Sequence, residues 1–180
     1  TQPRLVPSSL ELAYCPVMCQ GIVMKRVPLS VSVTPPLEML VQPEKDKYIS
    51  TEISNTGLWE PALTWLLTQL IEPGHHVIDV GANIGYYSLI LSRLVGPSGT
   101  VHAFEPDPIN YKLLRANVEL NACDNIITHE AALGNRSGEA KLSLATENLG
   151  DHRLFDTAGR ETRTVKEVTG DTSLPPDTAY

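Results

Sequence analysis

The chain has 180 residues, of which 42% are hydrophobic and 19% charged, and its net charge is −7. This length allows one domain with a sizeable core, and the composition is that of a globular protein. The acidic balance argues against nucleic acid and membrane surfaces as partners, because Lys and Arg clusters bind both. No apolar run long enough to span a bilayer is present and no secretory signal is visible, so we expect a cytoplasmic protein. The sequence starts at Thr1 rather than Met, so we expect a trimmed start.

Residues 1–46 are rich in proline and lack helical periodicity, which favours short strands. Alternating apolar residues predict one strand over Val27–Val33. We interpret residues 1–46 as an N-terminal extension that packs on the main domain, residues 47–180, or contacts a partner subunit. Its cysteines, Cys15 and Cys19, lack the third thiol of a metal loop, so we expect reduced thiols and no metal.

The main domain alternates helices and strands. A helix is expected from Glu60, with an apolar stripe formed by Leu63, Leu66, Leu67 and Leu70. After Pro73-Gly74 the predicted elements are a strand Val77–Val80, a helix with Ile84, Tyr87, Leu91 and Leu94 inward, a strand Thr100–Phe104, a helix capped by Asp107, and strands Ile126–Ala132 and Glu139–Ala145. Alternation of this kind predicts an α/β fold with a parallel sheet.

The sequence becomes polar after Thr146. We expect residues 146–164 to form a mobile loop and Thr164–Val168 to form one more short strand. This gives only three or four strands, fewer than an open sheet of this kind usually has. We therefore expect the C-terminal part of the fold to be missing.

The most informative segment is His76–Gly85, a buried strand followed by a glycine turn. Such a turn is expected to leave free backbone N–H groups at the start of the next helix. Glu105, about 20 residues past Gly85, has the position and charge to bind ribose hydroxyls. Asp79 stands where a dinucleotide fingerprint has glycine, and its charge would repel a pyrophosphate. The pattern favours a positively charged adenosyl cofactor such as S-adenosylmethionine.

A series of short motifs carries a family resemblance. They are Gly57–Pro61, Val77–Ser88, Phe104–Pro108, Leu114–Asn117 and Ala131–Gly134. Their order and spacing resemble the FkbM-type S-adenosylmethionine-dependent methyltransferases over residues 46–145. The resemblance implies a Rossmann-like class I methyltransferase sheet, and the family's members are mostly O-methyltransferases of polyketides, sugars and related secondary metabolites.

The resemblance also implies the cofactor-binding residues, with the catalytic residues left unspecified. They are Asp79, Gly81, Ala82, Asn83, Gly85, Tyr86, Glu105, Pro106, Glu130 and Ala131. The small residues would leave room for the methionine and ribose portions, Asp79 would organise the turn or attract the amino group, and Glu105 would accept both ribose hydroxyls. Glu130 and Ala131 would lie near adenine, although Glu130 is equally interpretable as a surface residue.

Three aromatic residues, Trp59, Tyr86 and Tyr87, lie near the glycine turn in the sequence. Trp59, with Glu60, either closes over the methionine end of the cofactor or anchors the core, and the core is favoured for Trp59. Helical phase places Tyr87 in the core and leaves Tyr86 to face the sulfonium.

The sequence thus predicts O-methylation of a hydroxyl group on a small molecule, either a secondary metabolite or a sugar. One alternative is a non-catalytic remnant that binds the cofactor or a partner, and another is an NAD-dependent oxidoreductase, because Glu105 would also suit the ribose of NAD. A homo-oligomer is left open, as are the acceptor and the general base.

Overall fold

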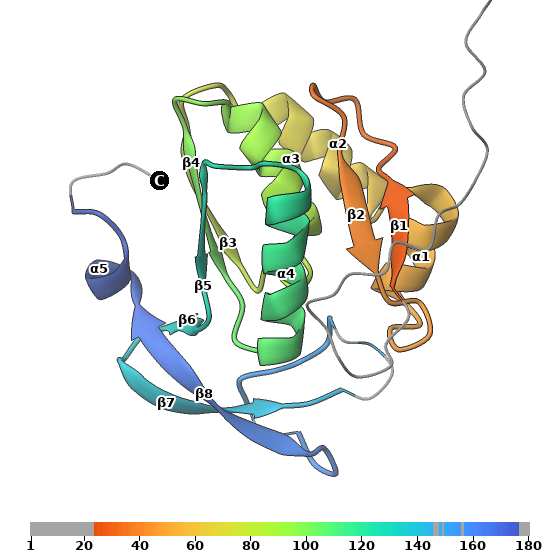
Figure 1. Ribbon diagram of the computed structural model, residues 1–180. Coiled ribbons are helices and arrows are strands. Elements are labelled where there is room, and N and C mark those ends of the chain that lie inside the picture. Colours follow the sequence, from red (N-terminus) through yellow and green to blue (C-terminus); the bar gives the residue numbers. More distant parts are fainter. Residues whose placement is uncertain (1–23, 146–147, 149, 156, 177–180) are drawn as a thin grey trace, which may run out of the picture.

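The structure is a computed structural model that describes residues 24–145, 148, 150–155 and 157–176. It contains a hairpin, a parallel sheet covered by helices and a second small sheet (Figure 1). The elements are β1 (Lys25–Pro28), β2 (Glu38–Val41), α1 (Ile49–Thr56), α2 (Pro61–Leu70), β3 (His76–Val80), α3 (Tyr86–Val95), β4 (Thr100–Phe104), α4 (Pro108–Leu120), β5 (Ile126–His129), β6 (Ala132–Gly134), β7 (Gly138–Ser143), β8 (Thr162–Thr169) and α5 (Gly170–Ser173).

The central sheet holds β3, β4 and β5 in that order, all parallel. Helices α3 and α4 connect these strands and lie on the same side of the sheet (Figure 1). Val101 and Ala103 of β4 are fully buried in one core with Leu89, Ile90 and Leu114 of the two helices. This arrangement confirms the predicted Rossmann-like α/β class. It also places the carboxyl ends of the three strands along one edge, where α/β sheets bind ligands.

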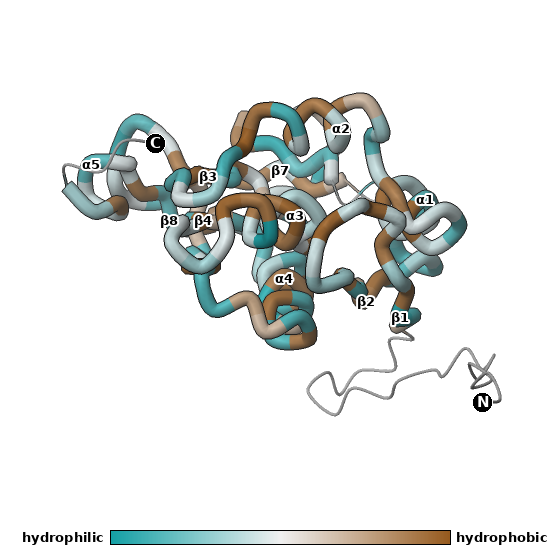
Figure 2. Tube along the Cα trace, turned by 90° about the horizontal axis from the view of Figure 1, so that it is seen from above, coloured by the Kyte–Doolittle hydropathy of each residue, from teal (hydrophilic) through white to brown (hydrophobic). Residues whose placement is uncertain are grey.

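The described part of the N-terminal extension belongs to the same core. Strands β1 and β2 form an antiparallel hairpin, so the single predicted strand corresponds to two shorter ones. Met39 and Val41 of β2 are fully buried in the cluster that contains the residues of α3 and α4. In Figure 2 the hydrophobic segments of α3 lie in the middle of the molecule, between α2 and α4.

Helix α1 was not predicted from the sequence. It is short and polar, and its start is fixed by a residue that precedes it: the Asp46 carboxylate accepts hydrogen bonds from the backbone N–H groups of Tyr48 at 3.2 Å and Ser50 at 2.8 Å. By contrast, the predicted cap of α4 is confirmed, because the Asp107 side chain accepts from the N–H groups of Ile109 and Asn110.

The third predicted strand is divided at Glu130-Ala131. Its first part, β5, stays in the parallel sheet, whereas β6 joins a second sheet of order β6-β8-β7. The predicted fourth strand is β7, which pairs antiparallel with β8 rather than entering the central sheet. Strand β8 covers the predicted Thr164–Val168 strand and extends it at both ends.

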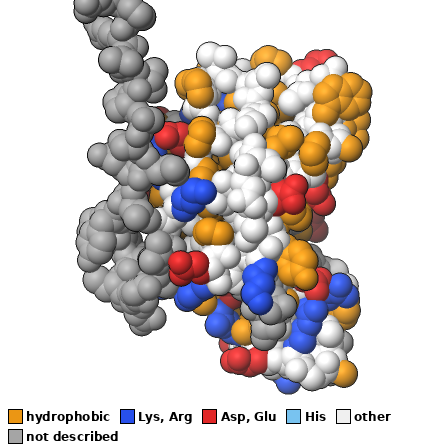
Figure 3. All heavy atoms as spheres, turned by 90° about the vertical axis from the view of Figure 1, so that its right-hand side faces the viewer, with side chains coloured by type: hydrophobic (Ala, Val, Ile, Leu, Met, Phe, Trp, Pro, Cys, Tyr) orange, Lys and Arg blue, Asp and Glu red, His pale blue; other side chains and the backbone are white. Residues whose placement is uncertain are grey.

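Helix α2 carries the predicted apolar stripe on a surface that the described residues leave open. Leu63 is 42% exposed, Leu66 41% and Leu70 59%, and Trp65 on the same helix is 64% exposed. Figure 3 shows hydrophobic side chains gathered on the upper part of one face, and Lys and Arg mixed with Asp and Glu on its lower part. None of the helices in the described ranges has the length and apolar character needed to cross a bilayer.

Candidate functional site

The glycine turn between β3 and α3 has a left-handed backbone at three positions: Gly81 (φ 78°), Asn83 (φ 51°) and Gly85 (φ 95°). A Cβ at Gly81 would meet no atom within 4 Å, whereas one at Gly85 would lie 2.7 Å from Leu114 Cδ1. Gly85 is therefore required for packing against α4, and Gly81 faces open space. A ligand can approach the main chain closely at Gly81.

The backbone N–H groups of this turn are not free, which corrects the expectation from the sequence. Those of Gly81 and Ala82 both donate to the Phe104 carbonyl at 2.9 Å, and that of Gly85 donates to the Ala82 carbonyl at 2.8 Å. The N–H of Asn83 donates to Glu105 Oε2 at 2.8 Å. The turn folds over the end of β4, where these acceptors are within reach. A ligand at the turn would therefore be recognised by the shape of the turn and by nearby side chains.

Glu105, at the end of β4, holds the turn in place. Its side chain is buried, and its two oxygens accept hydrogen bonds from the N–H groups of Asn83 and Asp107, each at 2.8 Å. Burial raises the pKa of Glu105 to about 7, and the charges of Asp107 and Asp79 also raise it. Each carboxylate oxygen has a second lone pair, so Glu105 is able to accept two further donors from a ligand.

Asp79, at the end of β3, contacts the first turn of α3. Its carboxylate accepts a hydrogen bond from Ser88 Oγ at 2.6 Å. The cap residue of α3 is Gly85, which has no side chain to accept a hydrogen bond. Burial of the carboxyl group raises the pKa of Asp79. This contact joins the end of β3 to α3, and the role of Asp79 toward the turn or the cofactor stays a prediction.

Two long-range contacts near this edge of the sheet were not predicted from the sequence. Asp107 was recognised only as a helix cap, yet it is 3% exposed at its side chain and forms an ion pair with Arg163 of β8. This pair joins the second sheet to the edge where Glu105 lies. The sequence gives no local signal for it, because the two residues are 56 positions apart.

Asn117 of α4 makes the second of these long-range contacts. Its fully buried side chain joins the β1-β2 hairpin to the glycine turn. Its amide donates to the carbonyls of Ile84 at 2.8 Å and Leu40 at 3.1 Å, and its oxygen accepts from the Leu40 N–H at 2.7 Å. The Leu114–Asn117 motif quoted for the family resemblance contains this residue, and a polar residue on the inward face of a helix was the available signal.

The two tyrosines after the turn differ in their burial. Tyr86 is 3% exposed, and its hydroxyl lies 3.2 Å from Thr64 Oγ1, whereas Tyr87 is half-buried and donates to Glu60 Oε2 at 2.5 Å. Tyr87 packs against the core, as helical phase predicted, but Tyr86 is buried as well and Tyr87 is the more accessible ring. A contact between Tyr86 and the sulfonium stays a prediction. Trp59 is partly buried against the core, as favoured.

The remaining predicted residues lie at the same edge of the sheet. The N–H of Glu105 donates to the His129 carbonyl at 3.0 Å, which joins the ends of β4 and β5. Pro106 follows Glu105, while Glu130 and Ala131 follow β5, with Glu130 exposed and Ala131 4% exposed. The structure thus brings the ends of all three parallel strands together, as the sequence predicted.

No group of three or more metal-ligating side chains is found among the described residues. Cys15 and Cys19 lie outside those residues, and Cys123 is buried with a free thiol.

The comparison with protein families decides the class of this fold. The model of the FkbM methyltransferase domain matches residues 79–175, more than half of the chain. The chain belongs to the FkbM methyltransferase family. This confirms the predicted family, and S-adenosylmethionine, the predicted cofactor, is the cofactor of that family.

Several curated methyltransferases match parts of this FkbM domain. A "Methyltransferase 1" of Beauveria bassiana is 29% identical over 92 residues, covering 51% of this chain and 36% of that protein. The 31-O-demethyl-FK506 methyltransferase FkbM of Streptomyces tacrolimicus is 51% identical over 47 residues, covering 26% and 18%. A protein-L-isoaspartate O-methyltransferase of Aeropyrum pernix is 30% identical over 125 residues, covering 65% and 47%. The chain therefore spans less than half the length of these relatives.

Solved methyltransferase structures match the FkbM domain more distantly. The Pyrococcus horikoshii TYW2 structure with MeSAdo has a TM-score of 0.40 at 22% identity, covering 59% of this chain and 34% of that one. The M. jannaschii TYW2 structure in complex with AdoMet has a TM-score of 0.40 at 23% identity, covering 51% of this chain and 38% of that one.

Proposed function

We propose that this FkbM domain binds S-adenosylmethionine at the carboxyl ends of β3, β4 and β5 and transfers its methyl group to a hydroxyl oxygen of a small molecule. The acceptor class is a secondary metabolite or a sugar. The proposal rests on family membership for methyl transfer and on the geometry of the glycine turn for the cofactor. The O-methyltransferases among the relatives support oxygen as the acceptor atom.

The observation that carries the cofactor assignment is the group of carboxylates around the turn. Asp79 and Asp107 both raise the pKa of Glu105 electrostatically, so the three carboxyl groups act on one another. Asp107 is paired with Arg163, so Asp79 and Glu105 give the turn its acidic character, which favours a sulfonium and an ammonium group over a pyrophosphate. Gly81 adds an open space in which a Cβ would meet no atom within 4 Å. The carboxyl groups and the open space at Gly81 therefore fit S-adenosylmethionine.

Each residue would have a distinct task. Glu105 would accept the ribose hydroxyls while still holding the N–H groups of Asn83 and Asp107. Gly81 would allow the methionine portion to lie against the main chain, and Ala131 would leave room beside adenine. The bound cofactor supplies an activated methyl group, and the protein's part is to fix donor and acceptor at attack distance.

Calorimetric titration with S-adenosylhomocysteine tests the cofactor assignment. We expect saturable one-to-one binding that Glu105→Gln weakens about tenfold, and that Glu119→Gln, an exposed substitution on α4, leaves unchanged. Methyl transfer from S-adenosylmethionine to a panel of hydroxylated acceptors then tests the reaction. Absence of binding at millimolar ligand contradicts the proposal.

A second candidate is a module that binds the cofactor without turnover. The observation in its favour is that, among the described residues, β3 pairs with β4 alone, and Val80 at the end of β3 is 60% exposed. Binding of S-adenosylhomocysteine without single-turnover methyl transfer to any acceptor supports this candidate. The nicotinamide alternative has no support from the family assignment, and titration with NADH, followed by its fluorescence, provides the direct check. A cytoplasmic location stays a prediction.

A further inference from the structure

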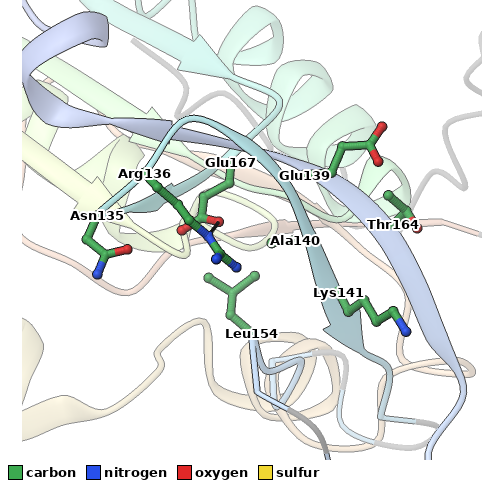
Figure 4. A pocket seen from close by; sticks show the side chains of 8 residues that line it. All are labelled: Asn135, Arg136, Glu139, Ala140, Lys141, Leu154, Thr164 and Glu167. Atoms are coloured by element: carbon green, nitrogen blue, oxygen red, sulfur yellow. Dashed lines mark hydrogen bonds and ion pairs between the residues drawn. The ribbon is translucent and has the colours of Figure 1, made fainter.

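The second sheet carries a hollow that the cofactor assignment does not use. Its volume is about 710 Å³, and it lies against β7 and β8 and the residues that precede β7. Figure 4 shows the side chains of Arg136, Glu167 and Leu154 pointing toward one another in this hollow, whereas Glu139, Lys141 and Thr164 extend farther along the strands. The hollow therefore combines one ion pair with an apolar side chain.

Glu167 is the unusual member of this group, because it is 7% exposed and carries a carboxylate. Its Oε2 accepts from Arg136 Nε at 3.2 Å, and no other described residue donates to the carboxylate. A Cβ at Gly134 would lie 2.1 Å from Glu167 Oε1, so the glycine makes the space that this oxygen occupies. This oxygen accepts no hydrogen bond from the described residues, so a ligand in the hollow can donate to it.

Arg136 supplies the complementary groups. Its side chain is 75% exposed, and within the described part of the chain only its Nε is hydrogen-bonded, so both terminal nitrogens are free to donate. An ion pair with so exposed a partner contributes little to stability. Asn135 beside it is exposed and offers one further donor and acceptor. Arg136 and Glu167 are therefore better placed to bind a ligand than to stabilise the fold.

The charges of Arg136 and Glu167 cancel, and this indicates the net charge of a ligand that would bind them. A ligand that satisfies both partners must donate to Glu167 and accept from Arg136 without a net charge of its own, and neighbouring hydroxyl groups do both. Leu154 and Ala140 provide apolar surface for the C–H face of such a molecule. An anionic ligand would meet the buried carboxylate and a cationic one the guanidinium, so the hollow favours a neutral polyhydroxylated molecule.

The hollow is within reach of the proposed cofactor site. Ala131 lies at the end of the parallel sheet, and Asn135 is four residues farther along the chain, so their Cα atoms are separated by at most about 14 Å. An acceptor of two or three sugar rings spans that distance. Binding of its remote part would contribute to holding the reacting hydroxyl in place.

We infer that the hollow formed by Arg136, Glu167 and Leu154 is a subsite for the remote, polyhydroxylated part of the methyl acceptor. This inference rests on the proposed function, because it assigns the hollow to the acceptor of that reaction. The subsite is distinct from the cofactor residues and can be examined without them.

Saturation-transfer NMR with four neutral probes tests the inference: the methyl glycosides of glucose, galactose and rhamnose, and maltose. We expect at least one to bind the full chain with a millimolar Kd, and Glu167→Gln to weaken that binding about tenfold, as for loss of one charge-assisted hydrogen bond. The matched control is Glu161→Gln, an exposed residue just before β8 that does not line the hollow. Arg136→Gln should also weaken binding, and Arg115→Gln on α4 should not.

Glucose 6-phosphate and glucosamine serve as charged probes. Tighter binding of either charged probe than of the neutral glycosides overturns the inference, as does absence of binding by all four neutral probes, or unchanged binding in both Glu167→Gln and Arg136→Gln. Circular dichroism and S-adenosylhomocysteine titration of each variant separate the outcomes. If the wild-type chain binds S-adenosylhomocysteine but none of the sugars, the subsite alone is refuted. If the wild-type chain does not bind S-adenosylhomocysteine, the proposed function is refuted.

Discussion

The carboxylate of Glu105 accepts a hydrogen bond from the backbone N–H of Asn83 at 2.8 Å, and this bond joins the end of β4 to the glycine turn after β3. Asn83 has a left-handed backbone, with φ at 51°, which an asparagine tolerates better than most residues. Glu105 thus holds the turn in a left-handed conformation. Under the proposed function, the same residue would serve both the fold and the binding site.

We expect the pKa of Glu105, about 7, to make cofactor binding depend on pH. Ribose hydroxyls would donate more strongly to the ionised carboxylate than to the protonated group, so ionisation should strengthen binding. We expect the affinity for S-adenosylhomocysteine to rise about tenfold between pH 6 and pH 8, which calorimetry at several pH values measures. Glu105→Gln cannot ionise and should remove this dependence. A parallel pH dependence in wild type and Glu105→Gln would contradict the prediction.

Stability should respond to the same group in the opposite direction. The pKa of Glu105 is higher in the folded chain than in the unfolded one, so the folded state binds more protons between the ordinary pKa of Glu and about 7. Its contribution to stability is therefore greatest at low pH and is lost as pH rises through that window. Chemical denaturation without ligand measures the free energy of unfolding of wild type and of Glu105→Gln. The difference between the two should decrease as the pH rises from 5 to 8.

Gly81 and Gly85 provide a matched pair for separating binding from folding. Both have positive φ, so alanine is strained at each by about 1–2 kcal/mol. A Cβ at Gly85 also meets Leu114 Cδ1 at 2.7 Å, whereas one at Gly81 meets nothing within 4 Å. Gly85→Ala should therefore lower the free energy of unfolding by about 2–4 kcal/mol, more than Gly81→Ala does. Gly81→Ala should instead reduce S-adenosylhomocysteine affinity. Urea denaturation and calorimetry measure the two effects, and equal stability losses would count against this assignment.

The alternation of strands and helices in the central sheet was predictable because the sequence patterns that indicate each element are local. The glycine turn, the Asp107 cap and the apolar strands each depend on a few adjacent residues, and the structure contains all three. The order of strand ends then follows from the parallel topology, which brought Gly81, Glu105 and Ala131 to one edge. These features give the candidate site its position.

The predictions that the structure corrected concern features that depend on contacts between residues far apart in the sequence. The division of the third strand at Glu130-Ala131 is made by β8, whose Glu167 pairs with Ala132 across 35 positions of sequence. The N–H groups of the glycine turn find acceptors on Phe104 and Glu105, which no local pattern reveals. The burial of Tyr86 has a similar origin, because its hydroxyl lies 3.2 Å from Thr64 Oγ1 of α2, 22 positions away in the sequence.

Asn117 should show how strongly the hairpin and the turn are coupled. Asn117→Leu would leave the Leu40 N–H and the carbonyls of Leu40 and Ile84 without their partner in a fully buried position. We expect the free energy of unfolding to fall by about 3 kcal/mol, and cofactor affinity to fall as well, because Ile84 belongs to the turn. Asn55→Leu, at an exposed position of α1, should change both by little. Chemical denaturation and calorimetry provide the comparison, and a stability loss without any change in affinity would show that the turn is fixed by other contacts.

The histidine pair on the central sheet should make the fold sensitive to acid. His102 Nδ1 lies 3.1 Å from His129 Nε2, and the His129 ring stacks on Phe104 with centroids 4.1 Å apart. Burial lowers the pKa of both histidines, so each takes up a proton less readily in the folded chain than in the unfolded one. Stability should therefore be lost as pH falls below about 6.5, the ordinary pKa of histidine. Thermal unfolding from pH 7.5 to pH 5.5 measures this loss, which His129→Gln should reduce. His75→Gln, at an exposed position before β3, should leave the slope unchanged, and an equal effect of the two substitutions would show that the pair is not the acid-sensitive element.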